Sequence, residues 1–213
     1  MPLGKPRAER ADAKRNRLRL LEVAREMIAE HGTGGVTMDA LAERAGLGKG
    51  TVFRRFGTRA GIFKALLEEE ASRFQGLVLS GPPPLGPGAG PAERLIAYGR
   101  MHTYFLIDNL AVARAAMERD GGLPAVEVDM TQTHFRVLLG QADLAMPDLD
   151  SLALQLAAAL EGPLLLFLAS SQAAEPPTAE FGHRLADGWQ ALVERLFGLD
   201  TPPRARNGPA PER

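Results

Sequence analysis

The residues best suited to recognition chemistry are polar and basic side chains that lie together on one short segment. Arg54 and Arg55 can each place a planar guanidinium on the O6 and N7 atoms of guanine, or on phosphate oxygens. Lys49 adds a point charge for a phosphate or a guanine edge, and Thr51 can form a hydrogen bond or touch a thymine methyl group. Gly50 allows the backbone to come close to a partner. The segment therefore predicts recognition of a nucleic acid.

Two short helices must position these side chains. The first is predicted over 37–45, where the Thr37 hydroxyl can cap the amino terminus and Asp39 suits the positive end of the helix dipole. Gly46 can adopt the left-handed conformation that ends a helix sharply. The second helix is predicted over 49–56. Its buried side is predicted to comprise Val52, Phe53 and Phe56.

Two helices joined by a glycine-containing turn, the second polar and basic outside, form a helix-turn-helix that can enter a DNA major groove. Flanking residues extend its reach. The amides at the start of the next helix, at Thr58 and Arg59, suit a backbone phosphate. The full set predicted to contact DNA is Lys14, Arg15, Thr37, Lys49, Gly50, Thr51, Phe53, Arg54, Arg55, Thr58 and Arg59.

The run from Leu20 to Glu70 resembles the DNA-binding domain of the TetR (tetracycline-repressor-like) family. The matching order is an apolar-periodic helix that ends at His31-Gly32, then Val36-Thr37, Leu41-Ala42, Ala45-Gly46-Leu47 and Lys49-Gly50-Thr51, followed by an aromatic pair around two arginines. Two positions depart from the family pattern. Gly48 replaces a usual Ser or Thr helix cap, and Phe53 replaces a usual Tyr, so two hydroxyls that can reach phosphates are absent.

The rest of the chain predicts an all-α fold, because no period-2 apolar run of useful length occurs. Further helices are expected at about 13–31, 59–79, 92–110, 111–119, 124–142, 148–172 and 178–197. A Gly- and Pro-rich loop over 80–91 separates the fourth helix from the fifth. The expected domains are a disordered basic arm over 1–12, a helix-turn-helix domain over 13–58, a helical domain over 59–197 that starts with the connecting helix 59–79, and a disordered tail over 198–213.

Charge is divided unevenly along the chain. Residues 1–60 hold 13 Lys and Arg against 7 Asp and Glu, a balance of +6, and residues 61–213 hold 12 against 19, a balance of −7. This asymmetry predicts an anionic polymer as partner of the first part only. Cysteine is absent, which excludes disulfides and thiolate metal sites, and the sequence shows no signal-peptide pattern. We therefore expect a cytoplasmic protein without a cofactor or metal.

The apolar stretch 152–169 is better explained as a buried helix than as a membrane span, because Gln155 and Glu161-Gly162-Pro163 interrupt it. Pro163 should kink this helix or begin a new segment. No membrane partner is therefore expected.

The resemblance implies a ligand pocket and a dimer interface in the C-terminal domain. Candidate pocket residues are Met101, Tyr104, Phe105, Met117, Met130, His134 and Trp189, although such side chains at helical spacing are also typical of plain core. Candidate interface residues on the last two helices are Leu152, Leu156, Leu160, Leu164, Leu185 and Leu192, together with Trp189.

The function that this resemblance implies is a homodimeric repressor, bound to a palindromic operator and released by a small lipophilic effector. Two alternatives remain open at this point. One is a DNA-binding regulator without a small-molecule effector, which works through a protein partner. The other is an all-α ligand-binding or enzymatic protein in which the helix-turn-helix is only structural. The sequence contains no nucleophile elbow, zinc-protease motif or dinucleotide fingerprint, and we expect no enzyme.

Overall fold

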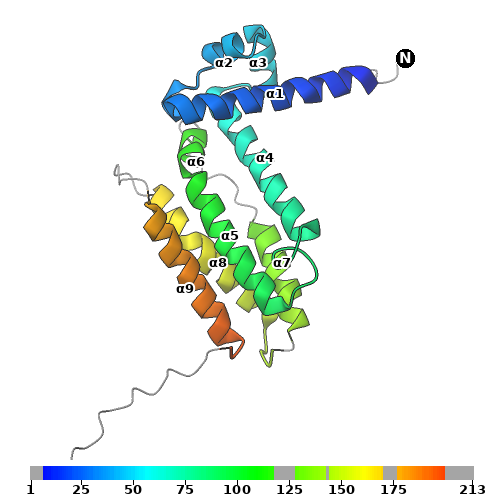
Figure 1. The fold of residues 1–213 in the computed structure, drawn as a ribbon, viewed down its shortest axis with the longest axis vertical. Helices are drawn as coiled ribbons and strands as arrows, with labels where there is room; N and C mark the ends of the chain where they lie inside the picture. Colours follow the sequence, from blue (N-terminus) through cyan, green and yellow to red (C-terminus); the bar gives the residue numbers. More distant parts are fainter. Residues whose placement is uncertain (1–6, 118–127, 143, 170–176, 200–213) are drawn as a thin grey trace, which may run out of the picture.

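The computed structural model of the protein describes residues 7–117, 128–142, 144–169 and 177–199, and within them the fold is all-α (Figure 1). The elements, in chain order, are α1 (Arg7–His31), the 3-10 turn η1 (Thr33–Gly35), α2 (Met38–Arg44), α3 (Lys49–Phe56), α4 (Arg59–Ser80), α5 (Pro91–Asp108), α6 (Leu110–Met117), α7 (Val128–Gln141), α8 (Leu149–Ala169) and α9 (Ala179–Leu196). We call α1 to α3 the head, and α5 with α7 to α9 the body. Helix α4 runs from the head down to the body.

The core of the head contains residues from a helix that the sequence assigns to the other domain. Leu20, Leu41 and Phe63 are buried at the contact of α1, α2 and α4. Val112 and Ala116 of α6 join the same cluster, and α6 also contacts α4 and η1. Helices α4 and α6, which the sequence analysis assigns to the second domain, therefore contribute to the core of the head.

The body has its own core, made where two helix pairs meet. Helix α5 packs along α9, and α7 packs along α8. Trp189 of α9 lies across the centre, where its ring nitrogen donates a hydrogen bond to the Leu95 carbonyl oxygen (2.8 Å) and its ring stacks on Phe135 (5.4 Å). A Cβ at Gly99 would lie 2.0 Å from the Trp189 ring nitrogen, so α5 can approach α9 this closely only because residue 99 is glycine.

The helix bounds agree with those predicted from sequence to within a few residues, with two differences. Helix α1 begins at Arg7 rather than near residue 13, within the arm that we expected to be disordered. Helix α8 continues through Pro163, so no new segment begins there. Proline removes the hydrogen bond to the carbonyl of Ala159, and that residue is exposed, where water can replace the lost donor. The expected starts and ends at 119, 124 and 172 lie outside the described residues.

Helix α8 also has the length and apolarity to cross a membrane, over Leu149–Leu168, and 33% of this stretch is buried in the structure. The buried side of the helix packs on α7 and contributes Ala153 and Leu156 to the body core. A core helix of a water-soluble protein has the same length and composition, so the stretch does not by itself indicate a membrane.

Candidate nucleic-acid interface

Helix α2 begins and ends at residues whose chemistry fits those positions. The Thr37 hydroxyl accepts a hydrogen bond from the Ala40 amide (3.1 Å). At the other end, Gly46 has φ +64°, and the Leu47 amide donates to the Ala42 carbonyl oxygen (2.9 Å). This is the bonding of a Schellman motif, which satisfies carbonyls at a helix end. The turn into α3 is therefore short and fixed, as the sequence predicts.

Helix α3 buries one side and leaves a polar side exposed. Val52 and Phe56 are buried against the head. Gly50 and Arg54, four residues apart, share the face opposite to this core, and Arg54 forms no ion pair or hydrogen bond within the part of the chain that the structure describes. A Cβ built at Gly50 meets no atom within 4 Å, so the fold itself does not need glycine there. The structure thus presents a bare backbone patch beside an outward arginine.

The remaining predicted side chains of α3 differ in their environments. Phe53 is 51% exposed, so the prediction that it packs in the core is wrong: it lies on the flank of the helix, between the buried and outer faces. Arg55 is exposed and takes part in a further interaction. Lys49 is exposed, and its Nζ lies 2.8 Å from Asp39 Oδ2 of α2. Thr51 is half-buried.

The start of α4 holds α3 in place. Gly57 ends α3 with φ +71°, and the Thr58 hydroxyl accepts a hydrogen bond from the Gly61 amide (3.0 Å). A Cβ at Gly61 would lie 1.9 Å from the Phe56 carbonyl oxygen. Only glycine allows the first turn of α4 to come this close to the end of α3, and this contact sets the direction of α3.

Arg59, predicted from sequence as a phosphate contact, is engaged within the protein. Its Nε donates to the Val36 carbonyl oxygen (2.7 Å), its Nη2 donates to the Thr33 carbonyl oxygen (2.5 Å), and its guanidinium lies over the Phe63 ring (4.9 Å). Arg59 therefore connects the start of α4 to the turn that precedes α2. The hydroxyls of Thr37 and Thr58 likewise act as helix caps in this structure.

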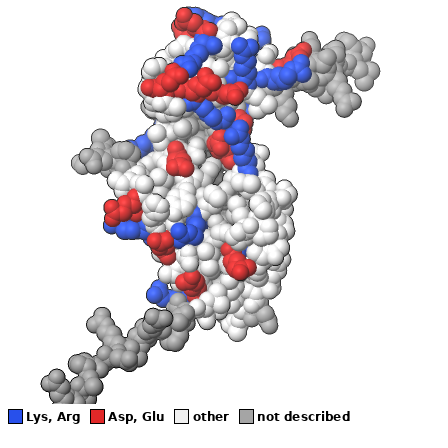
Figure 2. All heavy atoms as spheres, in the orientation of Figure 1, with Lys and Arg blue, Asp and Glu red and all other residues white. Residues whose placement is uncertain are grey.

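Other charges of the head join its helices to one another. Arg44 of α2 bonds to Glu30 of α1 (2.5 Å), and this bond lowers the pKa of the Glu30 carboxyl. Arg25 of α1 pairs with Glu70 of α4 (2.8 Å). Figure 2 shows charged side chains of both signs gathered over the head, and a body that is largely uncharged on this face. Much of the positive charge of residues 1–60 is therefore balanced within the head, and the outward face of α3 is an exception.

The two α1 residues predicted to contact DNA, Lys14 and Arg15, lie away from the α2–α3 turn in sequence. The Arg15 side chain is exposed and pairs with Asp12 of the same helix. The side chain of Lys14 lies outside the described part of the structure. The prediction of phosphate contacts from α1 is therefore left open for both residues.

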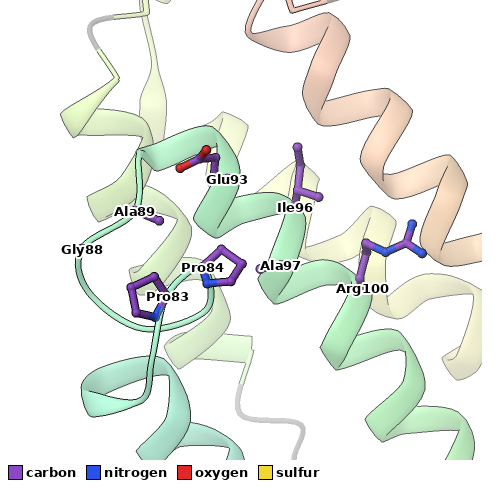
Figure 3. A pocket seen from close by; sticks show the side chains of 8 residues that line it. All are labelled: Pro83, Pro84, Gly88, Ala89, Glu93, Ile96, Ala97 and Arg100. Atoms are coloured by element: carbon purple, nitrogen blue, oxygen red, sulfur yellow. The ribbon is translucent and has the colours of Figure 1, made fainter.

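The predicted pocket residues differ in their burial. Met101 is 45% exposed, Tyr104, Phe105, Met117, Met130 and His134 are half-buried, and Trp189 belongs to the body core. A hollow of about 590 Å³ lies where the α4–α5 loop curves over α5, between Pro83, Pro84, Ile96 and Arg100 (Figure 3). A smaller one of about 200 Å³ lies between α8 and α9. Of the predicted set, only Trp189 lines either hollow.

The centre of the body instead holds a buried polar cluster, which we define as Tyr98, His102, Thr131, His134 and Glu161. The Tyr98 hydroxyl and the Thr131 hydroxyl are hydrogen-bonded (2.8 Å), and His102 Nε2 lies 3.7 Å from Glu161 Oε1. Both His102 nitrogens, His134 Nε2 and Glu161 Oε1 have no hydrogen-bond partner within the described residues.

Burial controls the protonation of this cluster. Desolvation lowers the pKa of His102 to about 4, and desolvation with the nearby Arg94 charge lowers that of His134 to about 4. Desolvation raises the pKa of Glu161, which a hydrogen bond with Thr131 partly opposes, and it raises the pKa of Tyr98 to about 12. Sequence reasoning missed Glu161 as a site residue. Its signal was the lone acid inside the apolar run 152–169.

The predicted dimer residues on α8 lie mostly on the side of the helix that faces the chain's own core. Leu156, Leu160 and Leu164 are buried within the chain's own core, and Leu152 packs against that core. After its first turn, which exposes Asp150 and Ser151, the residues that α8 exposes are Leu154, Gln155, Ala158, Ala159 and Leu166, the last 75% exposed. On α9, Leu185 is half-buried and Leu192 is 42% exposed, and both line the groove beside α8.

Comparison with known proteins gives the same assignment for the head. Residues 20–66 match the family described as bacterial regulatory proteins, tetR family. The HTH-type transcriptional repressor AcnR of Corynebacterium glutamicum is 40% identical over 63 residues, which are 30% of this chain and 34% of AcnR. An HTH-type transcriptional regulator of Staphylococcus aureus strain USA300 is 31% identical over 65 residues, 30% of this chain and 35% of that protein. The match thus spans about a third of each relative's length.

Solved structures resemble this chain over almost all of its length. A TetR-family transcriptional regulator from Pectobacterium atrosepticum has a TM-score of 0.63 at 21% identity, covering 94% of this chain and 100% of that one. A structure from Mesorhizobium loti, titled as a regulator of the same family, has a TM-score of 0.59 at 18% identity, covering 92% and 98%. At these identities the likeness shows the shared fold, head and helical body together. The head is thus similar in sequence to the tetR family of bacterial regulatory proteins, and almost the whole chain shares the fold of these two solved structures.

Proposed function

We propose that this protein is a transcriptional repressor, which binds a palindromic DNA operator as a homodimer and is released by a small lipophilic effector. The observation that carries the proposal is the outer face of α3. It presents Arg54 and the open backbone at Gly50 on a helix that the head holds rigidly from behind. A helix of this kind fits a major groove, where arginine reads guanine and phosphates. The name of the relative AcnR supports repression as the sign of regulation.

The exposed face of α8 supports the homodimer. Leu154 and Ala158 lie four residues apart on this face, and Leu166 lies eight residues further along it. Leu192 of α9 lines the groove beside α8. Apolar side chains exposed at this spacing on neighbouring helices are typical of a helix-packing surface. A two-fold axis through this surface would bury the same patch on both copies and place two α3 helices on one side of the dimer.

The connection between body and head supports regulation by an effector. Phe74 of α4 stacks on Phe105 (5.8 Å) and meets Tyr98 edge-on (5.1 Å), so α4 contacts the centre of the body. The amino-terminal end of α4, capped by Thr58, lies against α3, and α6 contributes to the core of the head. A ligand that separates α5 from α4 would therefore change the angle of α3. Such a ligand shifts the DNA-binding equilibrium only as far as it binds the two conformations with different affinity.

The proposal is tested by selecting DNA from a random duplex library with the full chain. We expect an inverted repeat whose half-sites lie about one helical turn apart, because two-fold symmetry in the protein requires symmetry in its site. Enrichment of no sequence, or of a single asymmetric site, would contradict the homodimeric reading. The Arg54→Ala variant should bind the selected DNA more weakly, and Arg136→Ala, an exposed arginine on α7, serves as its control.

The effector is tested separately from DNA binding. A thermal-shift screen of lipophilic compounds should find ligands that raise the melting temperature, since a ligand that binds only the native state stabilises it. Those ligands should then release the selected DNA. DNA binding with no response to any compound would favour the alternative of a regulator that works through a protein partner.

A further inference from the structure

We propose that the buried polar cluster of the body is a binding site for a lipophilic organic ammonium ion, with Glu161 as its counter-ion and His102 as a second acceptor. This proposal names the chemical class of the effector in the proposed function. Its regulatory part rests on that proposed function, whereas binding of the ammonium ion to the protein can be measured without DNA. The site keeps Phe105 and His134 of the predicted pocket residues and adds residues on α4, α5, α7 and α8.

The geometry of Glu161 and His102 fits a donor placed between them. Glu161 Oε1 and His102 Nε2 are 3.7 Å apart, and neither has a hydrogen-bond partner within the described residues. Neutral imidazole offers one nitrogen as an acceptor. An ammonium nitrogen at ordinary hydrogen-bond distance from both atoms forms a triangle on this 3.7 Å base, with one N–H to each. A ligand with a single N–H or O–H donor can satisfy only one of them.

Aromatic rings border this pair of acceptors. The ring of His102 lies 5.5 Å from Phe74, 5.5 Å from Tyr98 and 6.0 Å from Phe105, between centroids. The faces of Phe and Tyr rings attract a desolvated cation, and their area suits an apolar ligand body. The cluster thus combines a carboxyl group with ring faces. The nearby cation Arg94 acts on His134 and donates a hydrogen bond to the Val78 carbonyl oxygen.

The charge balance also favours a cation. Glu161 is 3% exposed and forms no ion pair with a lysine or arginine in the described part of the chain. Burial raises the pKa of its carboxyl, because the loss of water around the ionised form is not offset by a neighbouring positive charge. A ligand that carries a positive charge would stabilise the ionised form. The net charge of −7 over residues 61–213 attracts cations from solution to this half of the molecule.

The position of the cluster permits entry by a small shift of helices. It lies on the seam between the α5–α9 pair and the α7–α8 pair, with Tyr98 and His102 on one side and Thr131 and Glu161 on the other. Pro163, two residues after Glu161, removes a backbone hydrogen bond from α8 at this point. A ligand inserted at the seam would also press on Phe74, and so on α4.

The test uses calorimetric titration of the full chain, without DNA, with phenethylammonium and with its neutral counterpart phenethyl alcohol. We expect the ammonium ion to bind more tightly than the alcohol. In Glu161→Gln its affinity should fall by at least about tenfold, because the buried counter-ion is lost. The alcohol should bind this variant as it binds the wild type. Glu180→Gln, an exposed acid at the start of α9, is the matched control and should behave as wild type.

A second variant keeps the proposal testable if Glu161→Gln does not fold. Phe105→Leu removes one ring face at a half-buried position and should weaken the ammonium ion by about threefold or more, with little effect on the alcohol. The proposal is overturned if the alcohol binds as tightly as the ammonium ion, if the ammonium ion does not bind, or if Glu161→Gln leaves its affinity unchanged. Binding of the ammonium ion without release of DNA would uphold the site and contradict the effector part of the proposed function.

Discussion

At the scale of single residues, the outer face of α3 is defined by one side chain that is present and one that is absent. Arg54 extends outward with no partner within the described residues, and Gly50 leaves the backbone bare one turn before it. The protein's own packing explains neither residue. Glycine inside a helix costs about 0.5–1 kcal/mol relative to alanine, so its presence there has to be explained by something outside the chain, and close approach of DNA is the explanation we propose.

The first prediction follows from this argument. Gly50→Ala should raise the free energy of unfolding by about 0.5–1 kcal/mol, since the new methyl group meets no atom of the protein. The same change should weaken DNA binding, because the methyl group would stand between α3 and the groove. Urea unfolding and a DNA titration measure the two effects. Gly76→Ala, at an equally open site on α4, should stabilise the fold and leave DNA binding unchanged.

The ion pair between Lys49 and Asp39 gives a second prediction. Both side chains are exposed, and the Asp39 carboxylate holds the lysine ammonium 2.8 Å away while adding negative charge beside the proposed DNA face. Asp39→Asn should therefore increase DNA affinity, with a stability cost of about 0.3–1 kcal/mol from the lost favourable charge at the start of α2. A fluorescence-anisotropy titration measures the affinity. Glu43→Gln on the same helix removes an equal charge without touching Lys49, so an identical gain in both variants would argue against the role of this pair.

At the scale of elements, the sequence predicts the buried face of a helix only where one face is apolar and the other is polar. Helix α3 has three strongly apolar residues and a polar or basic remainder, so its outer face could be predicted, apart from Phe53 on its flank. Helix α8 is apolar on every side, and its buried stripe could not be told from its exposed stripe by composition. The packing of α7 and α5 decides the matter by covering Leu156 and Leu160 and leaving Leu154 and Leu166 outside.

The buried polar cluster shows the same limit. Its residues come from three helices, and their meeting depends on how α5, α7 and α8 are packed. Helical periodicity places each residue on a face of its own helix, but it gives no distance between helices. The contribution of α6 to the core of the head could not be predicted either, because the sequence of the short apolar helix Leu110–Met117 is compatible with packing on either domain.

A third prediction concerns the exposed face of α8. Leu166→Asp should raise the dimer dissociation constant by about tenfold or more, because it places a charge in an apolar interface. Leu166 is 75% exposed in the single chain, so the fold should tolerate the change. Sedimentation velocity measures the association. The control is Leu79→Asp, at a leucine of α4 that is 67% exposed. If Leu166→Asp remained as dimeric as the wild type, the interface would have to lie elsewhere.

At the scale of the whole molecule, helix α4 contributes to both cores, so a loss of stability in the body affects the head as well. The body buries His102 in its neutral form, with a pKa lowered to about 4. In the unfolded chain the same group has a pKa of about 6.5. Below that value the unfolded state binds more protons than the native state, so the native state loses stability as the pH falls from about 6.5 towards 4.

The fourth prediction follows from this linkage. Acidification from neutral pH to about pH 4 should cost on the order of 3 kcal/mol through His102 alone. His102→Gln should therefore show a weaker loss of stability in this pH range. Urea unfolding at several pH values measures it. His183→Gln, at an exposed histidine of α9, should keep the acid dependence of the wild type. Equal slopes for His102→Gln and the wild type would contradict a neutral, buried His102.

The central claim is that the outer face of α3 meets DNA. The most direct measurement is a titration of the selected operator with the Arg54→Ala, Arg55→Ala double variant over a range of salt concentrations. We predict an affinity lower by at least about tenfold, and a salt dependence whose slope is shallower by about two, because two cations no longer displace counterions from the DNA. Arg73→Ala with Arg136→Ala removes the same charge from α4 and α7 and should bind like the wild type. Unchanged affinity and slope in the α3 variant would contradict the claim.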